Sequence, residues 1–450
     1  MPYVPHTRED VARMLQAIGV PDVEKLLEAI PKSVRRSKPL DLPAGLDEVA
    51  LAERLEALAA RSIGAKLSFL GAGAYDHLVH PVVDQLLARS EILTPYTPYQ
   101  PEASQGTLQA VFEFQTMVAE LFGLEVANAS LYDGPSAAAE AVLMCRRLAK
   151  RERILVSAAL PPQVKRTIRT YTSSGAPELV EEIPYVPAAG AADLGALRAR
   201  LGPDVAAVLL GYPNYFGVPE DLEAAARLCC DAGAYLASYT PDPFALGVLR
   251  PPGAANVAVA VGEGQPLGLP MSFGGPGVGL IATRTEFVRQ VPGRLAGETV
   301  DTRGQRAFVL TLSTREQHIR REKATSNVCT NQGLCALGVT MHLSLIGPGG
   351  FRRIAETCHA RARALAARLA ALPGVHLAFA APYFHEFVLR HDGGKLATAA
   401  AKLERDGILL GVPLAPDFPE LDGAFLVTVT ERTRPADGER LADALRAALA

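Results

Sequence analysis

The chain has 450 residues, of which 49% are hydrophobic and 21% are charged, and its formal net charge is −3. A single hydrophobic core stops growing at roughly 250 to 300 residues, so the length predicts two or more packed units, and the composition excludes a disordered chain. The charges form no long basic run, which argues against nucleic acid or an anionic membrane surface as a partner.

The N-terminal sequence MPYVPHTREDVARML lacks the apolar middle of a signal peptide. No apolar stretch approaches the roughly 20 residues of a membrane helix. The six cysteines contain no CxxC pair, so neither a disulfide framework nor a metal site is expected. These features predict a cytoplasmic protein that works with small molecules or other proteins.

The first part of the chain shows a helical pattern from Thr7 to about Arg61, with Thr7 as a helix cap and Gly19 as a helix end. We therefore expect residues 1–70 to form a helical N-terminal arm. The stretch from Phe69 to Gly106 is broken by glycine and proline, and long irregular segments of this kind are usually functional.

Strand and helix patterns then alternate through residues 71–320. The expected helices are Leu108–Phe122, Ser136–Lys150, Pro161–Thr172 and Pro219–Ala232, and the expected strands are Arg153–Ser157, Val205–Leu210, Ala234–Tyr239, Asn256–Val261 and Val278–Thr283. The strands are apolar enough to be buried on both faces. This alternation predicts a large α/β domain with a mainly parallel sheet.

Residues 321–450 are expected to form a smaller α+β domain. Two helices flank the break GPGG, and shorter strands and helices alternate after them. The expected ranges are helices Gly333–Ser344, Phe351–Ala371, Lys395–Arg405 and Asp437–Leu449, and strands His376–Ala380, Glu386–Leu389 and Phe425–Thr430.

Several motifs together resemble one family. The segments TPYTPYQPEASQGTLQAVFEFQTMVAELFG, NASLYDGPSAAAEA, GEGQPLGLPMSFGGPG, RREKATSNVCTNQGLCAL and VTVTERTR span nearly the whole chain. They resemble glycine decarboxylase, the P-protein of the glycine cleavage system, in its two-chain form. The resemblance implies the fold type I architecture of pyridoxal-phosphate-dependent transferases, which is aspartate-aminotransferase-like. It also implies the reaction, in which glycine loses CO2 and its aminomethyl carbon passes to the lipoyl arm of the H-protein.

The chain departs from a complete pyridoxal-phosphate enzyme at the cofactor-anchoring lysine. A Schiff base needs an amine, but no lysine lies between Lys165 and Lys323. Compared with the similar segment of the catalytic partner, Gln265 stands at the lysine position. The strand Ala234–Tyr239 also lacks the carboxylate that would keep the pyridine nitrogen protonated, and we interpret the later Asp242 as a turn residue.

These deficits predict that the chain contains no catalytic residue of its own. We expect pyridoxal phosphate to be bound covalently by a lysine-bearing subunit 2, in an α2β2 assembly that acts on glycine and the lipoyl H-protein. Because fold type I dimers share active sites across their interface, this chain would contribute side chains to the partner's site. The candidates are Tyr96, Tyr99, Gln100, Ser104, Thr325, Ser326 and Asn327.

Other interpretations of these motifs are also consistent with the sequence. The segment Thr94–Gly106 could be a packed interface loop without chemistry, and Thr325 or Ser326 could cap a helix. The loop before Ser136 could bind a phosphate at a helix amino end, but Asp133 there favours capping. The glycines from Gly274 to Gly279 suit either a neighbour's phosphate or a tight turn.

Two further alternatives concern histidine and lysine. His77 and His80 have the spacing of a metal-ligand pair, although a hydrogen-bonding role for His77 is the expectation. The chain could instead be a self-contained pyridoxal-phosphate enzyme that uses Lys323, or a non-catalytic scaffold or regulatory subunit.

Overall fold

The computed structural model describes residues 6–36, 38, 40–62, 64–93, 98–172 and 179–450. The chain divides into two compact units, Met1–Ile63 (unit 1) and Gly64–Ala450 (unit 2). Tyr96 lies outside the described residues. The domain boundaries that the sequence suggests at residues 70 and 320 stay predictions.

Unit 1 consists of short helices whose amino ends are capped by polar side chains. The helices are α1 (Arg8–Ile18), α2 (Val23–Leu26) and α3 (Glu48–Ala59), and the caps are Thr7, Asp22 and Asp47. The predicted cap at Thr7 and helix end at Gly19 are confirmed. None of these three helices contains a buried residue, so no hydrophobic core of their own holds them.

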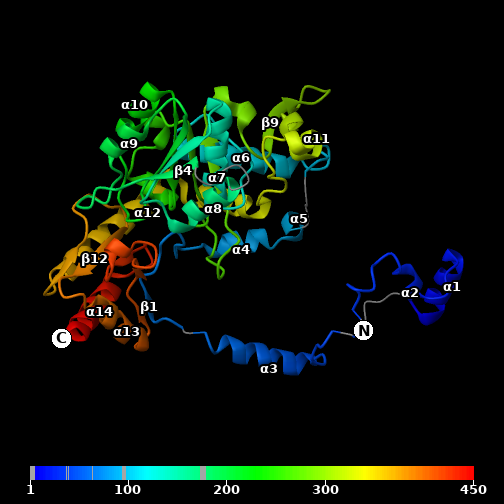
Figure 1. Cartoon of the computed structure of the whole chain (residues 1–450), viewed down its shortest axis with the longest axis horizontal. Coiled ribbons are helices and arrows are strands. Elements are labelled where there is room, and N and C mark those ends of the chain that lie inside the picture. Colours follow the sequence, from blue (N-terminus) through cyan, green and yellow to red (C-terminus); the bar gives the residue numbers. More distant parts are fainter. Residues whose placement is uncertain (1–5, 37, 39, 63, 94–97, 173–178) are drawn as a thin grey trace. The chain divides into compact units, whose positions relative to one another are not determined.

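Unit 2 is built on a seven-stranded sheet (Figure 1). Neighbouring strands β4, β3, β5, β6 and β7 run parallel, whereas β8 pairs antiparallel with both β7 and the edge strand β2. In sheet order the strands are β2 (Val126–Ala127), β8 (Gly279–Thr283), β7 (Val259–Glu263), β6 (Tyr235–Thr240), β5 (Val205–Gly211), β3 (Arg153–Ser157) and β4 (Val180–Ile183). The predicted mainly parallel sheet is confirmed.

Helices cover both faces of this sheet because successive strand side chains point to opposite sides. Val259 and Val261 of β7 pack in a core with α7 and α8, whereas Ala260 packs with α6 and α12. Toward β4, the second face is covered by α9 and α10. These helices are α6 (Gln105–Phe122), α7 (Gly134–Ala149), α8 (Pro162–Thr172), α9 (Leu194–Arg200), α10 (Leu222–Ala232) and α12 (Gly333–Ala370).

The C-terminal part forms a second, antiparallel sheet covered by helices. Its strand order is β11 (Val375–Leu377), β12 (Glu386–His391), β15 (Phe425–Thr428) and β14 (Val412–Pro413), and its helices are α13 (Leu396–Arg405) and α14 (Pro435–Leu449). These elements share one core with the second half of α12. The predicted small α+β layer is therefore present.

Helix α12 joins the two sheets, and it differs from the two separate helices that the sequence suggested. The predicted break at GPGG survives as a kink, since Gly347 has a non-helical conformation and Pro348 follows it. By length and composition α12 could cross a membrane. It packs, however, against α6 and the 3-10 helix η2 (Pro243–Gly247), as a core helix does.

In the part of the chain that the structure describes, two further strand pairs lie outside the two sheets. The hairpin of β9 (Leu295–Val300) and β10 (Arg306–Thr311) is antiparallel. The short strand β1 (Leu67–Ser68) pairs in parallel with β13 (Ile408–Leu409), and buried Phe69 follows it. Residues just after unit 1 are therefore anchored in the C-terminal core.

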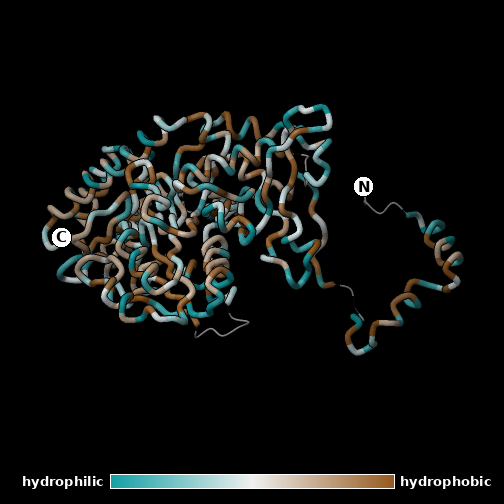
Figure 2. The backbone as a smooth tube through the Cα atoms, turned by 90° about the horizontal axis from the view of Figure 1, so that it is seen from above, coloured by the Kyte–Doolittle hydropathy of each residue, from teal (hydrophilic) through white to brown (hydrophobic). Residues whose placement is uncertain are grey.

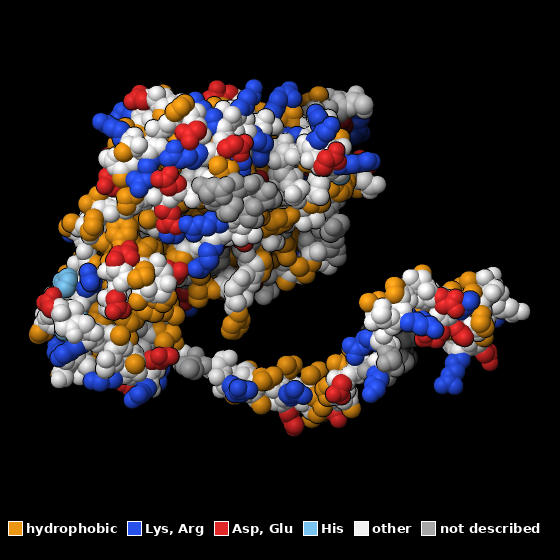
Figure 3. Space-filling model, in the orientation of Figure 1, with side chains coloured by type: hydrophobic (Ala, Val, Ile, Leu, Met, Phe, Trp, Pro, Cys, Tyr) orange, Lys and Arg blue, Asp and Glu red, His pale blue; other side chains and the backbone are white. Residues whose placement is uncertain are grey.

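Hydropathy and charge follow this architecture. The hydropathy-coloured tube shows short hydrophobic and hydrophilic stretches alternating along unit 2 (Figure 2). On the face seen in Figure 3, Lys and Arg side chains are interspersed with Asp and Glu over unit 2. That face therefore has no block of a single charge.

The β1–β13 pair and buried Phe69 predict that the residues just after unit 1 stabilise unit 2. The reference is a chain that begins at Gly64 and keeps both features. A matched truncation that begins at Gly71 removes β1 and Phe69, and its free energy of unfolding in urea should be lower than that of the reference by about 3 kcal/mol or more. Equal free energies of unfolding in both truncations would contradict a stabilising role for β1 and Phe69.

Candidate functional site

Three of the residues singled out from the sequence lie at the carboxyl ends of β6 and β7 or at the amino end of α7 beside them. Ligand sites of open α/β sheets lie at this edge. Asp242 follows β6, Gln265 follows β7, and Asp133 is the N-cap of α7. The three positions thus belong to one side of the sheet.

Gln265 is 7% exposed and uses its amide to join two loops. Its Nε2 donates to the carbonyl oxygens of Leu269 at 2.7 Å and Tyr75 at 3.3 Å, and its Oε1 accepts from the Tyr75 N–H at 3.3 Å. Tyr75 is held in turn by its hydroxyl, which donates to Glu386 at 2.8 Å. Gln265 therefore links unit 2's sheet edge to the segment before α4 (Pro81–Leu87).

Glu263, the last residue of β7, places its carboxylate against the start of α7. Its Oε2 accepts from the Gly134 N–H at 2.7 Å, and its Oε1 accepts from the Gln265 and Val278 N–H groups at 2.9 Å each. Burial raises the pKa of Glu263 to about 7, against the lowering effect of these backbone donors. Sequence reasoning missed this residue; an acid that ends a buried apolar strand was the available signal.

The residues before α7 cap the amino end of this helix, as the sequence predicted. The Asp133 side chain accepts from the Ser136 N–H at 2.7 Å, and the Ser136 hydroxyl accepts from the Asp133 N–H at 3.1 Å. Pro135 removes another donor from the first turn. The expected capping role of Asp133 and Ser136 is confirmed.

Asp242 is more than a turn residue. Its side chain accepts from the Phe244 N–H at 3.0 Å, as the turn interpretation requires. It also meets Nε2 of His77 at 2.9 Å and Nε2 of His385 at 3.1 Å. Burial would raise the pKa of Asp242, but the two imidazoles lower it well below its ordinary value.

His77 lies between two carboxylates. Its Nδ1 is 2.6 Å from Glu431, which follows β15, while its Nε2 faces Asp242. Burial would lower the pKa of His77, but the two carboxylates raise it to about 10. The buried imidazole is therefore an imidazolium at neutral pH, and the expected hydrogen-bonding role of His77 is confirmed.

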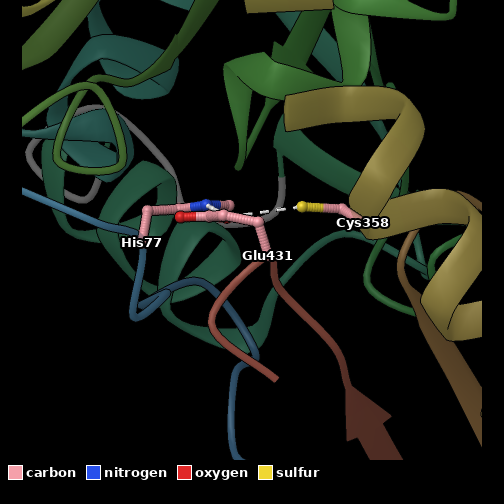
Figure 4. A group of neighbouring side chains, drawn as sticks. All are labelled: His77, Cys358 and Glu431. Carbon is pink, nitrogen blue, oxygen red and sulfur yellow. Dashed lines mark hydrogen bonds and ion pairs between the residues drawn. The ribbon is translucent and has the colours of Figure 1, made fainter. Parts of the chain in front are cut away.

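Cys358 completes a cluster with these two side chains. Figure 4 shows Cys358 projecting from α12 toward Glu431, with His77 on the other side of Glu431 in this view. Both the Cys358 thiol and His77 Nδ1 meet Oε2 of Glu431. The three ligand atoms lie within 4.8 Å of one another, a spacing that could hold a metal ion. However, burial raises the pKa of the thiol, and His77 Nδ1 lies at hydrogen-bonding distance from Glu431. The hydrogen bond between His77 Nδ1 and Glu431 therefore occupies two of the atoms that would have to bind the metal ion.

The His77 and His80 pair, considered as metal ligands from spacing, does not form a joint set. Both ring nitrogens of His77 face carboxylates, whereas the His80 ring lies 5.6 Å from the ring of His342.

The loop predicted to reach a neighbouring site is partly exposed. The Tyr99 side chain is half exposed, accepts a hydrogen bond from Arg294 at 2.8 Å and lies under its guanidinium. Gln100 is exposed. Ser104 precedes α6, and its hydroxyl makes no cap hydrogen bond among the described residues. The Tyr99 hydroxyl is therefore held by Arg294, while Gln100 is exposed and Ser104 is half-buried.

In the second predicted group, Thr325 to Asn327, the first two residues make hydrogen bonds within this chain and the third is exposed. The Ser326 hydroxyl donates to Glu140 of α7 at 2.7 Å and accepts from the Val328 N–H at 3.1 Å. The Thr325 N–H donates to the Arg315 carbonyl oxygen at 3.0 Å. Ser326 thus fixes a turn within this chain, whereas Asn327 is exposed.

The glycine-rich loop contains both close packing and an exposed turn. A Cβ on Gly279 would lie 2.4 Å from the Asp133 carbonyl oxygen, so only glycine fits there. Ser272, Phe273, Gly274 and Gly275 all have positive φ, and the Phe273 side chain is fully exposed. The first half of this loop is a projecting turn.

Comparison with known proteins gives one consistent result. A model of the family described as "Glycine cleavage system P-protein" matches residues 1–445. A "Probable glycine dehydrogenase (decarboxylating) subunit 1" from Sorangium cellulosum is 50% identical over 447 residues, which cover 98% of this chain and 98% of the relative.

Solved structures agree. An inhibitor-bound glycine decarboxylase (P-protein) of the glycine cleavage system matches with a TM-score of 0.89 and 42% identity, covering 100% of both chains. A glutamate decarboxylase from Lactobacillus brevis matches with a TM-score of 0.69 at 15% identity, over 93% of this chain and 96% of that one, and so shares the fold alone. The predicted fold type I class is confirmed.

The His77 geometry predicts a pH-dependent stability. The pKa of His77 rises from 6.5 in the unfolded chain to about 10 in the fold, so its contribution is complete below pH 6.5 and is lost as the pH rises through about 10. His77→Gln should lower the free energy of unfolding by about 3 kcal/mol at neutral pH, because two carboxylates stay buried without their cation.

Urea unfolding at several pH values checks this prediction. The decline of stability between pH 6.5 and 10 should be weaker in His77→Gln than in the wild type. His376→Gln, which changes an exposed pair with Asp392, is the matched control and should behave like the wild type. An unchanged pH profile in His77→Gln would contradict the buried imidazolium.

Proposed function

This chain belongs to the glycine cleavage system P-protein family, and from that premise we propose that it is the subunit of a two-chain glycine decarboxylase that lacks the cofactor-anchoring lysine. The enzyme is glycine dehydrogenase (aminomethyl-transferring), in which glycine loses CO2 and its aminomethyl group passes to the lipoyl arm of the H-protein. Its cofactor is pyridoxal phosphate, which supplies the electron sink for loss of CO2.

The observation that carries the proposal is Gln265. A glutamine amide cannot form a Schiff base, and here its oxygen and nitrogen are both engaged with backbone groups. The surroundings do not fit the cofactor either, since Glu263 lies on the amino end of α7 and Asp242 is shared by two histidines. We therefore assign covalent attachment of the cofactor to a lysine-bearing subunit 2.

The contribution of this chain is proposed to be made in trans, at the partner's site. Exposed Gln100 and half-buried Ser104 support this role because neither is needed to cap α6. The full candidate set stays as the sequence suggested it: Tyr96, Tyr99, Gln100, Ser104, Thr325, Ser326 and Asn327. Within it, Ser326 would act through Glu140 rather than by direct contact, since its hydroxyl is already engaged.

The remaining parts of the proposal concern assembly and location. We propose an α2β2 heterotetramer that receives the H-protein and works in the cytoplasm. Met271 and fully exposed Phe273, on the projecting glycine-rich loop, suit a protein contact.

Two other functions are less well supported. A self-contained enzyme would need Lys323, but that side chain is exposed on η6 (Arg321–Lys323), whereas Gln265 and Glu263 are buried. A scaffold without any active-site contribution would leave the exposed polar loop before α6 without a role.

The proposal predicts complementation. The purified chain with added pyridoxal phosphate should show no aldimine absorption and release no CO2 from carboxyl-labelled glycine, because it offers no amine beside β7. Adding subunit 2 should give both signals. Borohydride reduction should label a subunit 2 peptide, and a labelled Lys323 peptide would instead favour the self-contained enzyme.

The trans contribution predicts a loss of activity without loss of assembly. Gln100→Ala and Ser104→Ala should lower the rate of the reconstituted enzyme by about tenfold to a hundredfold if they position groups at the partner's site. Glu102→Ala, an exposed neighbour in the same loop, serves as the control and should keep full activity. If all three variants assemble and retain full activity, the proposed role in trans is wrong, and the result favours a non-catalytic scaffold.

A further inference from the structure

The amino end of α7 is an anion site that the chain fills itself. A helix amino end presents free N–H groups and a partial positive charge, and phosphate groups bind there in many folds. In this chain the group on it is the Glu263 carboxylate, which also accepts from two N–H groups of the neighbouring loop. Three backbone donors thus converge on one carboxyl group.

The donors of the first turn are all committed. The Gly134 N–H donates to Glu263 and the Ser136 N–H donates to Asp133, while Pro135 has no backbone N–H. Ala137 already makes the first helical bond, to the Asp133 carbonyl oxygen. The first turn therefore has no N–H group left for an outside anion.

The space around the carboxylate is closed as well. A Cβ on Gly134 would lie 2.8 Å from the Glu263 Cβ and 2.8 Å from the Tyr239 hydroxyl, and a Cβ on Gly277 would lie 3.0 Å from Glu263 Oε2. Both glycines thus bring the backbone against Glu263. Asp133 adds a second negative charge beside it, which would repel any further anion.

We propose that Glu263 is an internal substitute for the cofactor phosphate: its carboxylate occupies the anion cradle of α7, so that this chain's own vestigial site excludes phosphorylated ligands. The fold type I likeness makes this cradle the place of the phosphate. The inference deepens the proposed function, on which its biological meaning rests, but it concerns contacts within this chain and is tested without the partner.

The test uses inorganic phosphate as the probe and the full chain as the protein. Glu263→Ala should expose the three backbone donors and gain a saturable phosphate site, at least about tenfold tighter than any binding by the wild type. The unfolding temperature of the variant should rise with phosphate concentration, measured against chloride at equal ionic strength. Calorimetric titration gives the stoichiometry, which should be one phosphate per chain.

Two further variants separate the effects of charge and space. Glu263→Gln keeps the volume without the charge, so it should lose stability yet gain no phosphate site. Glu220→Ala is the matched control, because Glu220 is equally buried, also has a pKa raised to about 7 by burial, and accepts from one backbone N–H away from α7. This control should stay insensitive to phosphate.

The outcomes are decisive in each direction. Folded Glu263→Ala that responds to phosphate no more than Glu220→Ala would overturn the proposal. If Glu263→Ala does not fold in phosphate-free buffer, phosphate must restore its native circular dichroism, and failure to do so would equally overturn it. The complementation experiment can fail or succeed independently of these results, so the two ideas are distinguishable.

Discussion

A positive charge buried between two carboxylates holds the centre of this molecule together. His77 comes from the segment before α4, Asp242 from the end of β6, and Glu431 from the loop after β15, so the triad ties three distant parts of the chain at one point. Each charge would be costly to bury alone, and here the imidazolium and the two carboxylates compensate one another. The position of the Tyr75 segment, and through it the contacts of Gln265, depends on that fixed point.

Much of the fold could be predicted because it follows from local pattern. The strand Arg153–Ser157 was found to the residue, since an apolar run between polar ends is unambiguous in a buried parallel sheet. The strand predicted at Asn256–Val261 instead begins at Val259 and ends at Glu263. Two of its residues were missed because the apolar pattern stops before the acid. The β9–β10 hairpin was missed because only the first two residues of β9 are buried, and the rest of that strand, GETV, is not an apolar run.

The site was predictable only in part, for a different physical reason. The lack of an amine at Gln265 is written in the sequence, and the cap at Asp133 follows from local hydrogen bonding. The partners of His77 are not local, since Glu431 lies 354 residues away along the chain. The carboxylate of Glu263 likewise reaches Gly134 across 129 residues. Such contacts arise from the topology of the fold, and no periodicity or spacing in the sequence predicts them.

The carboxylate on α7 also bears on how the stability of this chain responds to the supply of small molecules. A cofactor stabilises the protein that binds it in proportion to its concentration, so a cofactor-binding subunit gains stability only when the cofactor is available. A side chain bound at its own helix is present at an effective concentration that never changes. A chain built in this way reaches its full stability whether or not a phosphorylated ligand is present.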